Sequence, residues 1–298
     1  MNPIRQILAL VSDGARSEAV LALAARLAAR QGAGLLALHA VTPATSGAYL
    51  TPEAAALAIE LTQRADAERH EAAAARVAAA AARSGQAIPL QRAEPDPVAA
   101  AAMRAHCSDL VVLAQRPLDG DDGTDAGFAG RLLVRAGAPL LFVPAVDTLD
   151  PEPDGAPPCG RRVLVAWAPK RESARALRDA LPLLAAAEQV EVVRMADPGE
   201  DRDAPEPLDA VCAHLQRHGV HARAHRLVRA GAGAGGGLLP DWSPDVPVAE
   251  ALLSHAADTG ADLLVMGGYG HSRAWELALG GVTRTMLKSM TLPVLMSH

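Results

Sequence analysis

Short apolar runs alternate with longer amphipathic stretches along the chain, and the whole alternation occurs twice. The first copy begins with an apolar run over 7–11 and an Ala/Leu-rich stretch over 17–31, and the second begins with matching segments over 163–167 and 172–187. Short apolar runs bounded by turns indicate buried strands, whereas longer stretches with apolar residues every three or four positions indicate helices. We therefore predict that the chain contains two copies of one strand and helix pattern.

The later strands of the two halves also match in pairs. They are expected at 35–41 and 190–195, at 108–113 and 261–266, and, each led by a proline, at 139–143 and 293–296. Strands that alternate with helices form parallel βαβ units, and continuous apolar strands belong to a sheet covered on both faces. The predicted fold class is α/β, with two doubly wound, Rossmann-like or flavodoxin-like open parallel sheets.

Pro, Asp and Gly are concentrated between the two halves, in a composition suited to an exposed linker. We expect a first domain over 1–146, a linker over 147–160 and a second domain over 161–298. The alanine-rich stretch 52–84 has charged residues on one side and predicts a surface helix, since it lacks the large apolar residues of a coiled coil. The glycine-rich insertion over 230–247 is expected to loop outward, and Trp242 within it is a candidate cover for a ligand.

Composition narrows the classes of partner. Aromatic residues make up 2% of the 298 residues and the formal net charge is −6, so neither stacking platforms nor a basic surface for nucleic acid is indicated. No run reaches the roughly 18 apolar residues of a membrane span, and the first apolar run is too short for a signal peptide, so we expect a cytoplasmic protein without membrane contact. The three cysteines form no Cys-x2-Cys pair, and the acidic segment 120–125 lacks the distal Glu of a calcium loop, so no metal site is expected.

The richest signal is a set of glycines near the end of the chain. Gly267, Gly268 and Gly270 follow an apolar strand, and Gly280 and Gly281 precede a predicted helix. Glycines let the backbone approach a ligand closely, and the free N–H groups of a helix start attract anions. The pattern predicts a phosphate cradle.

The spacing Gly267-x2-Gly270-x9-Gly280, continued through Val282 and Thr283 to the closing strand, resembles the nucleotide signature of the universal stress protein family. In that family the last glycine is normally followed by Ser or Thr, and here Gly281 follows it. The resemblance implies an adenine nucleotide alpha hydrolase-like fold, a role in the stress response, and ATP or a related adenine nucleotide as ligand, with Mg²⁺ as a candidate companion. It also implies pairing of final strands. Here the strands that begin at Pro139 and Pro293 would pair within one chain as an intramolecular pseudo-dimer, and a further homodimer is left open.

The resemblance divides the ligand site between the two halves. In the second half, the predicted nucleotide-binding residues are Ala166, Trp167, Met195, Met266, Gly267, Tyr269, Gly270, Gly280, Gly281, Val282 and Thr283. The family's acidic residue after the first strand is replaced there by Ala168, followed by Pro169 and Lys170. The first half has Asp13 at that turn but Ala114-Gln115-Arg116-Pro117 in place of the glycine loop, so we expect it to be a degenerate copy.

Three functional hypotheses follow. The first is a non-enzymatic stress response protein that binds ATP or a related nucleotide weakly in its second domain, as a sensor or regulator. The second is a scaffold or chaperone-like protein that binds no nucleotide and acts through protein contacts. The third, slow ATP hydrolysis, has only family analogy behind it. His271 and Ser272 are adjacent and cannot form a Ser–His pair, and the sequence contains neither a Gly-x-Ser-x-Gly nor a P-loop motif.

Overall fold

The computed structural model describes residues 3–14, 16–40, 52–93, 96–115, 127–146, 150, 152–153, 158–196, 208–228, 246–268 and 281–298. The first half contains β1 (Gln6–Val11), α1 (Ser17–Gln31), β2 (Gly34–His39), α2 (Pro52–Ser84), β3 (Leu90–Arg92), α3 (Pro97–Ala105), β4 (Leu110–Ala114), α4 (Phe128–Arg135) and β5 (Leu140–Val143). The second contains β6 (Arg162–Ala166), α5 (Arg171–Leu184), β7 (Gln189–Ala196), α6 (Leu208–Arg217), β8 (Ala222–Val228), α7 (Val246–Thr259), β9 (Leu263–Gly267), α8 (Gly281–Ser289) and β10 (Val294–Ser297). The expected α/β alternation is present in both halves.

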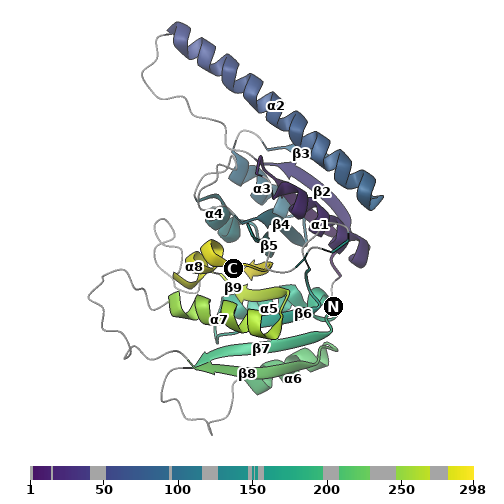
Figure 1. The fold of residues 1–298 in the computed structure, drawn as a ribbon, viewed down its shortest axis with the longest axis vertical. Helices are drawn as coiled ribbons and strands as arrows, with labels where there is room; N and C mark the ends of the chain where they lie inside the picture. Colours follow the sequence, from purple (N-terminus) through teal and green to yellow (C-terminus); the bar gives the residue numbers. More distant parts are fainter. Residues whose placement is uncertain are drawn as a thin grey trace, which may run out of the picture.

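All ten strands form one continuous sheet in the order β3-β2-β1-β4-β5-β10-β9-β6-β7-β8 (Figure 1). Strand pairs within each half are parallel, whereas β5 and β10 pair antiparallel, with Leu141 opposite Leu295. The predicted pairing of the two proline-led strands is therefore present. It covers one edge of each half, so the two expected sheets are continuous, and β3 and β8 form the outer edges.

Helices cover both faces of this sheet, as its apolar strands require. Helices α1, α2, α5 and α6 pack on one face, and α3, α4, α7 and α8 pack on the other. Each face has one apolar cluster that runs through both halves, built mainly from Ala, Leu and Val. The molecule is thus a three-layer α/β/α sandwich. The carboxyl ends of its strands lie next to loops and helix starts.

The halves repeat one hydrogen-bonding device in detail. Ile7 of β1 pairs with Leu110 of β4, and Val163 of β6 pairs with Leu263 of β9, which aligns the two copies residue by residue. The aspartate just before β4, Asp109, accepts hydrogen bonds from the backbone amides of Arg5 and Gln6 at 2.7 and 2.9 Å.

Its equivalent, Asp262, is buried and accepts from three amides, those of Gly160, Arg161 and Arg162, at 2.9 to 3.0 Å. Burial raises the pKa of this carboxyl group, and the backbone hydrogen bonds oppose that shift. In both halves a carboxylate therefore fixes the start of the first strand beside the fourth.

The helices differ more than the strands. Helix α2 spans Pro52–Ser84, as the alanine pattern predicts, whereas its counterpart α6 spans only Leu208–Arg217. Figure 1 shows α2 extending along one end of the molecule, beyond the sheet. No helix in the described part of the chain combines the length and apolar character needed to cross a membrane.

Candidate functional site

A cavity of about 300 Å³ lies at the carboxyl ends of β6, β7 and β9. Strand order diverges between β6 and β9, because the chain leaves β6 toward β7 on one side and later returns to β9 on the other. Ligands of open α/β sheets bind at such a divergence, outside the carboxyl ends of the strands. The lining residues are Ala166, Trp167, Ala168, Pro169, Lys170, Glu172, Ser173, Val193, Arg194, Met195, Val248, Leu252, Met266, Gly267, Gly281, Val282 and Thr283.

The structure brings eight of the eleven predicted site residues together around this one cavity. They are Ala166, Trp167, Met195, Met266, Gly267, Gly281, Val282 and Thr283. The other three, Tyr269, Gly270 and Gly280, lie outside the described residues, as do Trp242 and the acidic segment 120–125. Segments separated by more than 100 residues in the sequence thus line one hollow.

One wall of the cavity is apolar. Val193 and Met195 come from alternate positions of β7, Leu252 and Val248 from one face of α7, and Met266 from the end of β9. Alternate strand residues point to the same face of a sheet, and helix residues four apart lie one turn above each other. This wall provides an apolar surface of the kind that an aromatic ring system can contact.

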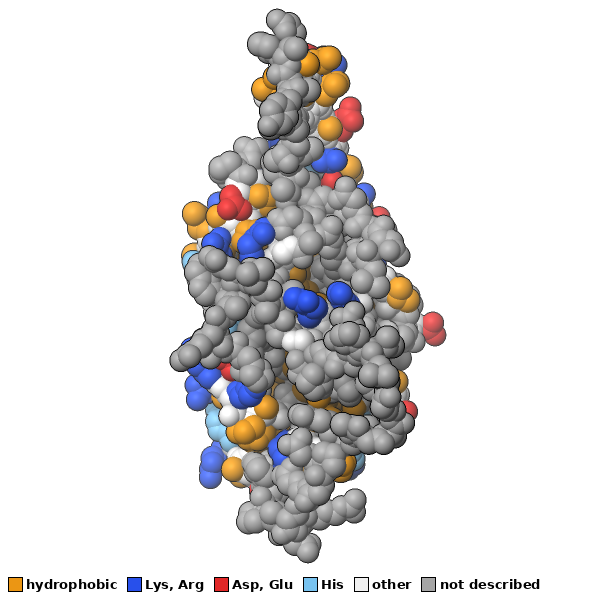
Figure 2. Space-filling view, turned by 90° about the vertical axis from the view of Figure 1, so that its left-hand side faces the viewer, with side chains coloured by type: hydrophobic (Ala, Val, Ile, Leu, Met, Phe, Trp, Pro, Cys, Tyr) orange, Lys and Arg blue, Asp and Glu red, His pale blue; other side chains and the backbone are white. Residues whose placement is uncertain are grey.

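The starts of two helices also line the cavity. Helix α8 begins at Gly281, and helix α5 begins at Arg171, with Lys170 as its N-cap residue and no side-chain hydrogen bond capping it. The first amides of a helix lack intrahelical partners and carry a partial positive charge. Two such starts at one cavity favour an anionic group. Figure 2 looks onto this edge of the molecule, where more Lys and Arg than Asp and Glu side chains are visible among the described residues.

The turn after the first strand shows which residue replaces the acidic one. In each half an amide donates to a serine hydroxyl five residues later, from Ser12 to Ser17 at 3.1 Å and from Ala168 to Ser173 at 3.3 Å. Ser12 is therefore equivalent to Ala168, and Asp13 is equivalent to Pro169. This corrects the sequence-based alignment by one residue, and the turn still has no carboxylate.

A carboxylate that the sequence analysis overlooked lies nearby. Glu172, in the first turn of α5, lines the cavity with a side chain 14% exposed, and its Oε1 is 3.4 Å from Nε of Arg171. From the sequence alone, Glu172 is an acidic residue in the first turn of a helix, where its charge interacts favourably with the helix dipole. Only the placement of α5 against β9 reveals that it belongs to the cavity.

The glycines have packing roles as well as lining roles. A Cβ on Gly267 would lie 2.6 Å from the carbonyl carbon of Glu172 and from the amide nitrogen of Ser173. A Cβ on Gly268 would lie 2.6 Å from Cδ2 of Leu133, in the first half. Gly267 therefore allows α5 to approach the end of β9, and Gly268 leaves room for the side chain of Leu133 from the other half.

The equivalent end of the first half holds a network of charged and imidazole side chains. Asp13 Oδ2 is 3.2 Å from Nε of Arg69 on α2, and Asp13 Oδ1 is 3.4 Å from Nε2 of His39 on β2. His39 also contacts His70 of α2, with 3.3 Å between their Nδ1 atoms. Burial lowers the pKa of His39, although Asp13 opposes this. The family resemblance assigns the carboxylate of Asp13 to a ligand. In this structure it contacts Arg69 and His39 instead.

Gln115 replaces the glycine loop in the first half and joins the halves. Its Nε2 donates to the carbonyl oxygen of Leu287 on α8 at 2.9 Å, and its Oε1 accepts from the amide of Ala145 at 2.7 Å. The residue is buried. Gln115 is equivalent to Gly268 of the glycine loop. In the first half, the segment expected to bind phosphate thus begins with a side chain that joins the two halves.

Comparison with known proteins agrees with this architecture. A family model described as the universal stress protein family matches residues 3–144 and again residues 160–298. A universal stress protein from Archaeoglobus fulgidus DSM 4304 has a similar structure, with a TM-score of 0.66 at 15% identity over 98% of this chain and 97% of that chain. A functionally unknown protein from Pseudomonas aeruginosa PAO1 gives 0.52 at 14% identity, over 99% of this chain and 92% of that one.

A third structure, a universal stress protein from Pseudomonas aeruginosa UCBPP-PA14, gives a TM-score of 0.51 at 15% identity, over 99% of this chain and 93% of that one. A comparison with curated proteins finds no match.

Proposed function

The chain belongs to the universal stress protein family and carries its fold twice, and on this basis we propose that the second half binds one adenine nucleotide, weakly, as a sensor or regulator. The first half contributes the fold and the interface. ATP, with Mg²⁺ as counter-ion, is the nucleotide to test first.

The observation that carries the proposal is one cavity with two chemically different sides. The apolar wall of Val193, Met195, Leu252 and Met266 suits a base, and the start of α8 suits phosphate. Both kinds of surface line the same cavity. Its volume of about 300 Å³ lies within the range of small-molecule sites.

Glu172 supplies the hydrogen-bond acceptor that Pro169 cannot. Proline at the first-strand turn offers no side-chain acceptor and no N–H. Glu172 lines the same cavity from the next turn of chain, and a carboxylate accepts hydrogen bonds from ribose hydroxyls or from an exocyclic amine. Its negative charge also places the phosphates at α8 and away from the first turn of α5.

Two universal stress protein structures that match about half of this chain are complexes, one with cAMP and one, from Archaeoglobus fulgidus, with dAMP, at TM-scores of 0.32 and 0.30. Those ligands are properties of those proteins. What supports the proposal for this chain is the geometry of its own cavity.

The proposal is tested by isothermal titration of nucleotide-stripped protein with ATP and Mg²⁺. We expect a single site. Gly281→Asp should weaken it by roughly tenfold or more, about 1.4 kcal/mol, because a carboxylate then stands where phosphate must bind. The same carboxylate favours the start of α8, so the helix should persist.

The matched control is Gly127→Asp at the N-cap of α4, the helix equivalent to α8 in the first half. It adds the same charge outside the proposed site and should leave ATP affinity unchanged. Gly281→Ser, which adds the hydroxyl usual in the family, should strengthen binding. Silence in the titration would overturn the proposal in favour of a scaffold that binds no nucleotide, and loss with Gly127→Asp but not with Gly281→Asp would overturn it in favour of a site in the first half.

A further inference from the structure

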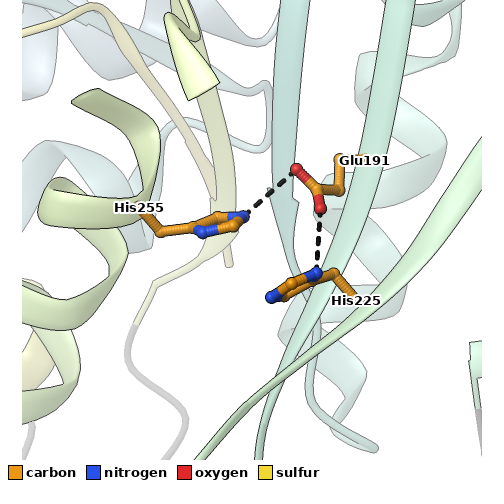
Figure 3. A group of neighbouring side chains, drawn as sticks. All are labelled: Glu191, His225 and His255. Carbon is orange, nitrogen blue, oxygen red and sulfur yellow. Dashed lines mark hydrogen bonds and ion pairs between the residues drawn. The ribbon is translucent and has the colours of Figure 1, made fainter. Parts of the chain in front are cut away.

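Three metal-ligating side chains meet beside the cavity of the second half, on the face of the sheet that α7 covers, and none of them lines that cavity. Glu191 extends from β7, His225 from β8 and His255 from α7 (Figure 3). Nδ1 of His225 lies 3.3 Å from Oε1 of Glu191, and Nε2 of His255 lies 3.1 Å from Oε2 of Glu191. One ligand atom from each residue lies within 4.8 Å of the other two.

We propose that Glu191, His225 and His255 form a binding site for a divalent first-row transition ion, with Zn²⁺ as the probe. This site is separate from the nucleotide cavity and does not depend on the proposed function.

The distances suit such an ion. With metal–ligand bonds of about 2.0–2.1 Å, neighbouring ligand atoms of a tetrahedral zinc site lie roughly 3.3–3.4 Å apart. The two imidazole–carboxylate separations here, one to each carboxylate oxygen, are 3.3 and 3.1 Å, and a single ligand atom from each residue lies within 4.8 Å of the other two. Two imidazole nitrogens and one carboxylate are also a set of protein ligands found at zinc sites that keep a position open.

The position of the glutamate in the sheet is a second indication. Glu191 is on the same face of β7 as Val193, the face on which α7 packs. A carboxylate at such a position is costly unless it is compensated. Glu191 forms no ion pair with Lys or Arg among the described residues, and its two partners are both imidazoles.

The exposure of the three side chains and their ligand atoms indicate which ions can bind. The side chains are 13%, 26% and 42% exposed for His255, Glu191 and His225, so the cluster is anchored at the helix and open at the sheet edge. Mg²⁺ and Ca²⁺ prefer oxygen ligands, whereas imidazole suits Zn²⁺, Ni²⁺, Cu²⁺ and Fe²⁺. The ion would fasten α7 to the two outermost strands.

The test is titration of the untagged, chelator-treated full-length chain with ZnCl₂, with Tm measured in parallel. The variant H225Q/H255Q keeps amide donors for Glu191 but removes both imidazole ligands. We expect it to lose one equivalent of Zn²⁺ and the rise in Tm that Zn²⁺ gives to the wild type. E191Q should weaken Zn²⁺ binding by at least about tenfold, since even residues that only support metal ligands cost that much.

The matched control is H214Q/H218Q, which removes another pair of neighbouring histidines among the described residues of the second half. These two lie on and just after α6, with ring centroids 4.8 Å apart. This variant should keep the Zn²⁺ equivalent that H225Q/H255Q loses. The proposal fails if the wild type binds no Zn²⁺, if H225Q/H255Q binds it as the wild type does, or if only H214Q/H218Q loses it. Circular dichroism of each variant separates loss of the ion from loss of the fold.

Discussion

The carboxyl ends of the strands meet different surroundings in the two halves of this molecule. In the first half, Arg69 and His70 of the long helix α2 reach Asp13 and His39, and Gln115 continues into the interface. In the second half, the shorter α6 leaves that end to a cavity lined by β6, β7, β9 and the starts of α5 and α8. The same strand order therefore supports a network of paired side chains in one copy and an open cavity in the other. A fold fixes where a site can be, and a few residues at the strand ends decide whether it is open.

The sharpest test of the repeat concerns its equivalent aspartates. Asp262→Ala leaves three backbone amides without their buried acceptor and should cost about 3 kcal/mol or more of unfolding free energy. Asp109→Ala removes an exposed acceptor from two amides and should cost less. Urea unfolding of both variants compares them. An equal or larger loss for Asp109→Ala would show that burial does not separate the two copies.

A smaller difference is expected at the ends of β4 and β9. Gly267→Ala forces a Cβ against the backbone of Glu172 and Ser173, and overpacking of this kind costs about 1–3 kcal/mol. The equivalent residue in the first half is already alanine, and Ala114→Gly should cost roughly 0.5–1 kcal/mol through chain entropy. Thermal unfolding measures both changes. A neutral Gly267→Ala would mean that α5 does not approach β9 as closely as the structure has it.

The smallest expected effect is the pH dependence contributed by His39. Its pKa is lowered in the folded protein from 6.5, chiefly by burial, so as the pH falls through 6.5 the unfolded chain takes up a proton that the folded protein resists. Stability should therefore fall on acidification, and the fall should be less steep in His39→Gln. Asp13, which opposes the burial effect, keeps the change small; His70 and Arg92, which also face His39, act in the same direction as burial.

Urea midpoints between pH 7.5 and 5 for the wild type and His39→Gln provide the measurement, since every other titratable group is present in both proteins. Parallel curves would contradict the placement of His39 in a buried network.

The repeating part of the fold could be predicted from the sequence because it depends on local patterns. The helix over 17–31 and the strand pairs follow from apolar periodicity, and the helix over 52–84 follows from its alanine content. The proline-led strands indicate where the halves join. Eight of the residues that line the cavity could be predicted as well. Those residues stand at the ends of predicted strands and at a predicted helix start, and such ends meet in a parallel sheet.

The rest depends on contacts between distant segments, which periodicity does not encode. Arg69 has the pattern of a solvated charge on a surface helix, and only the placement of α2 brings it to Asp13. The glutamate–histidine cluster could not be predicted without knowing that β8 lies beside β7 and that α7 packs over them. Its one signal in the sequence is Glu191, a charge between the apolar Val190 and Val192 of a predicted strand.

The antiparallel join between β5 and β10 has a consequence for how the two copies can change. In an assembly of two identical chains, each substitution would occur in both copies, and the assembly would come apart on dilution. Here the partners are tethered in one polypeptide, so their pairing is a unimolecular event that does not depend on protein concentration. Each copy is therefore free to accumulate its own substitutions, and the chain can hold two unlike strand ends that a symmetric pair could never combine.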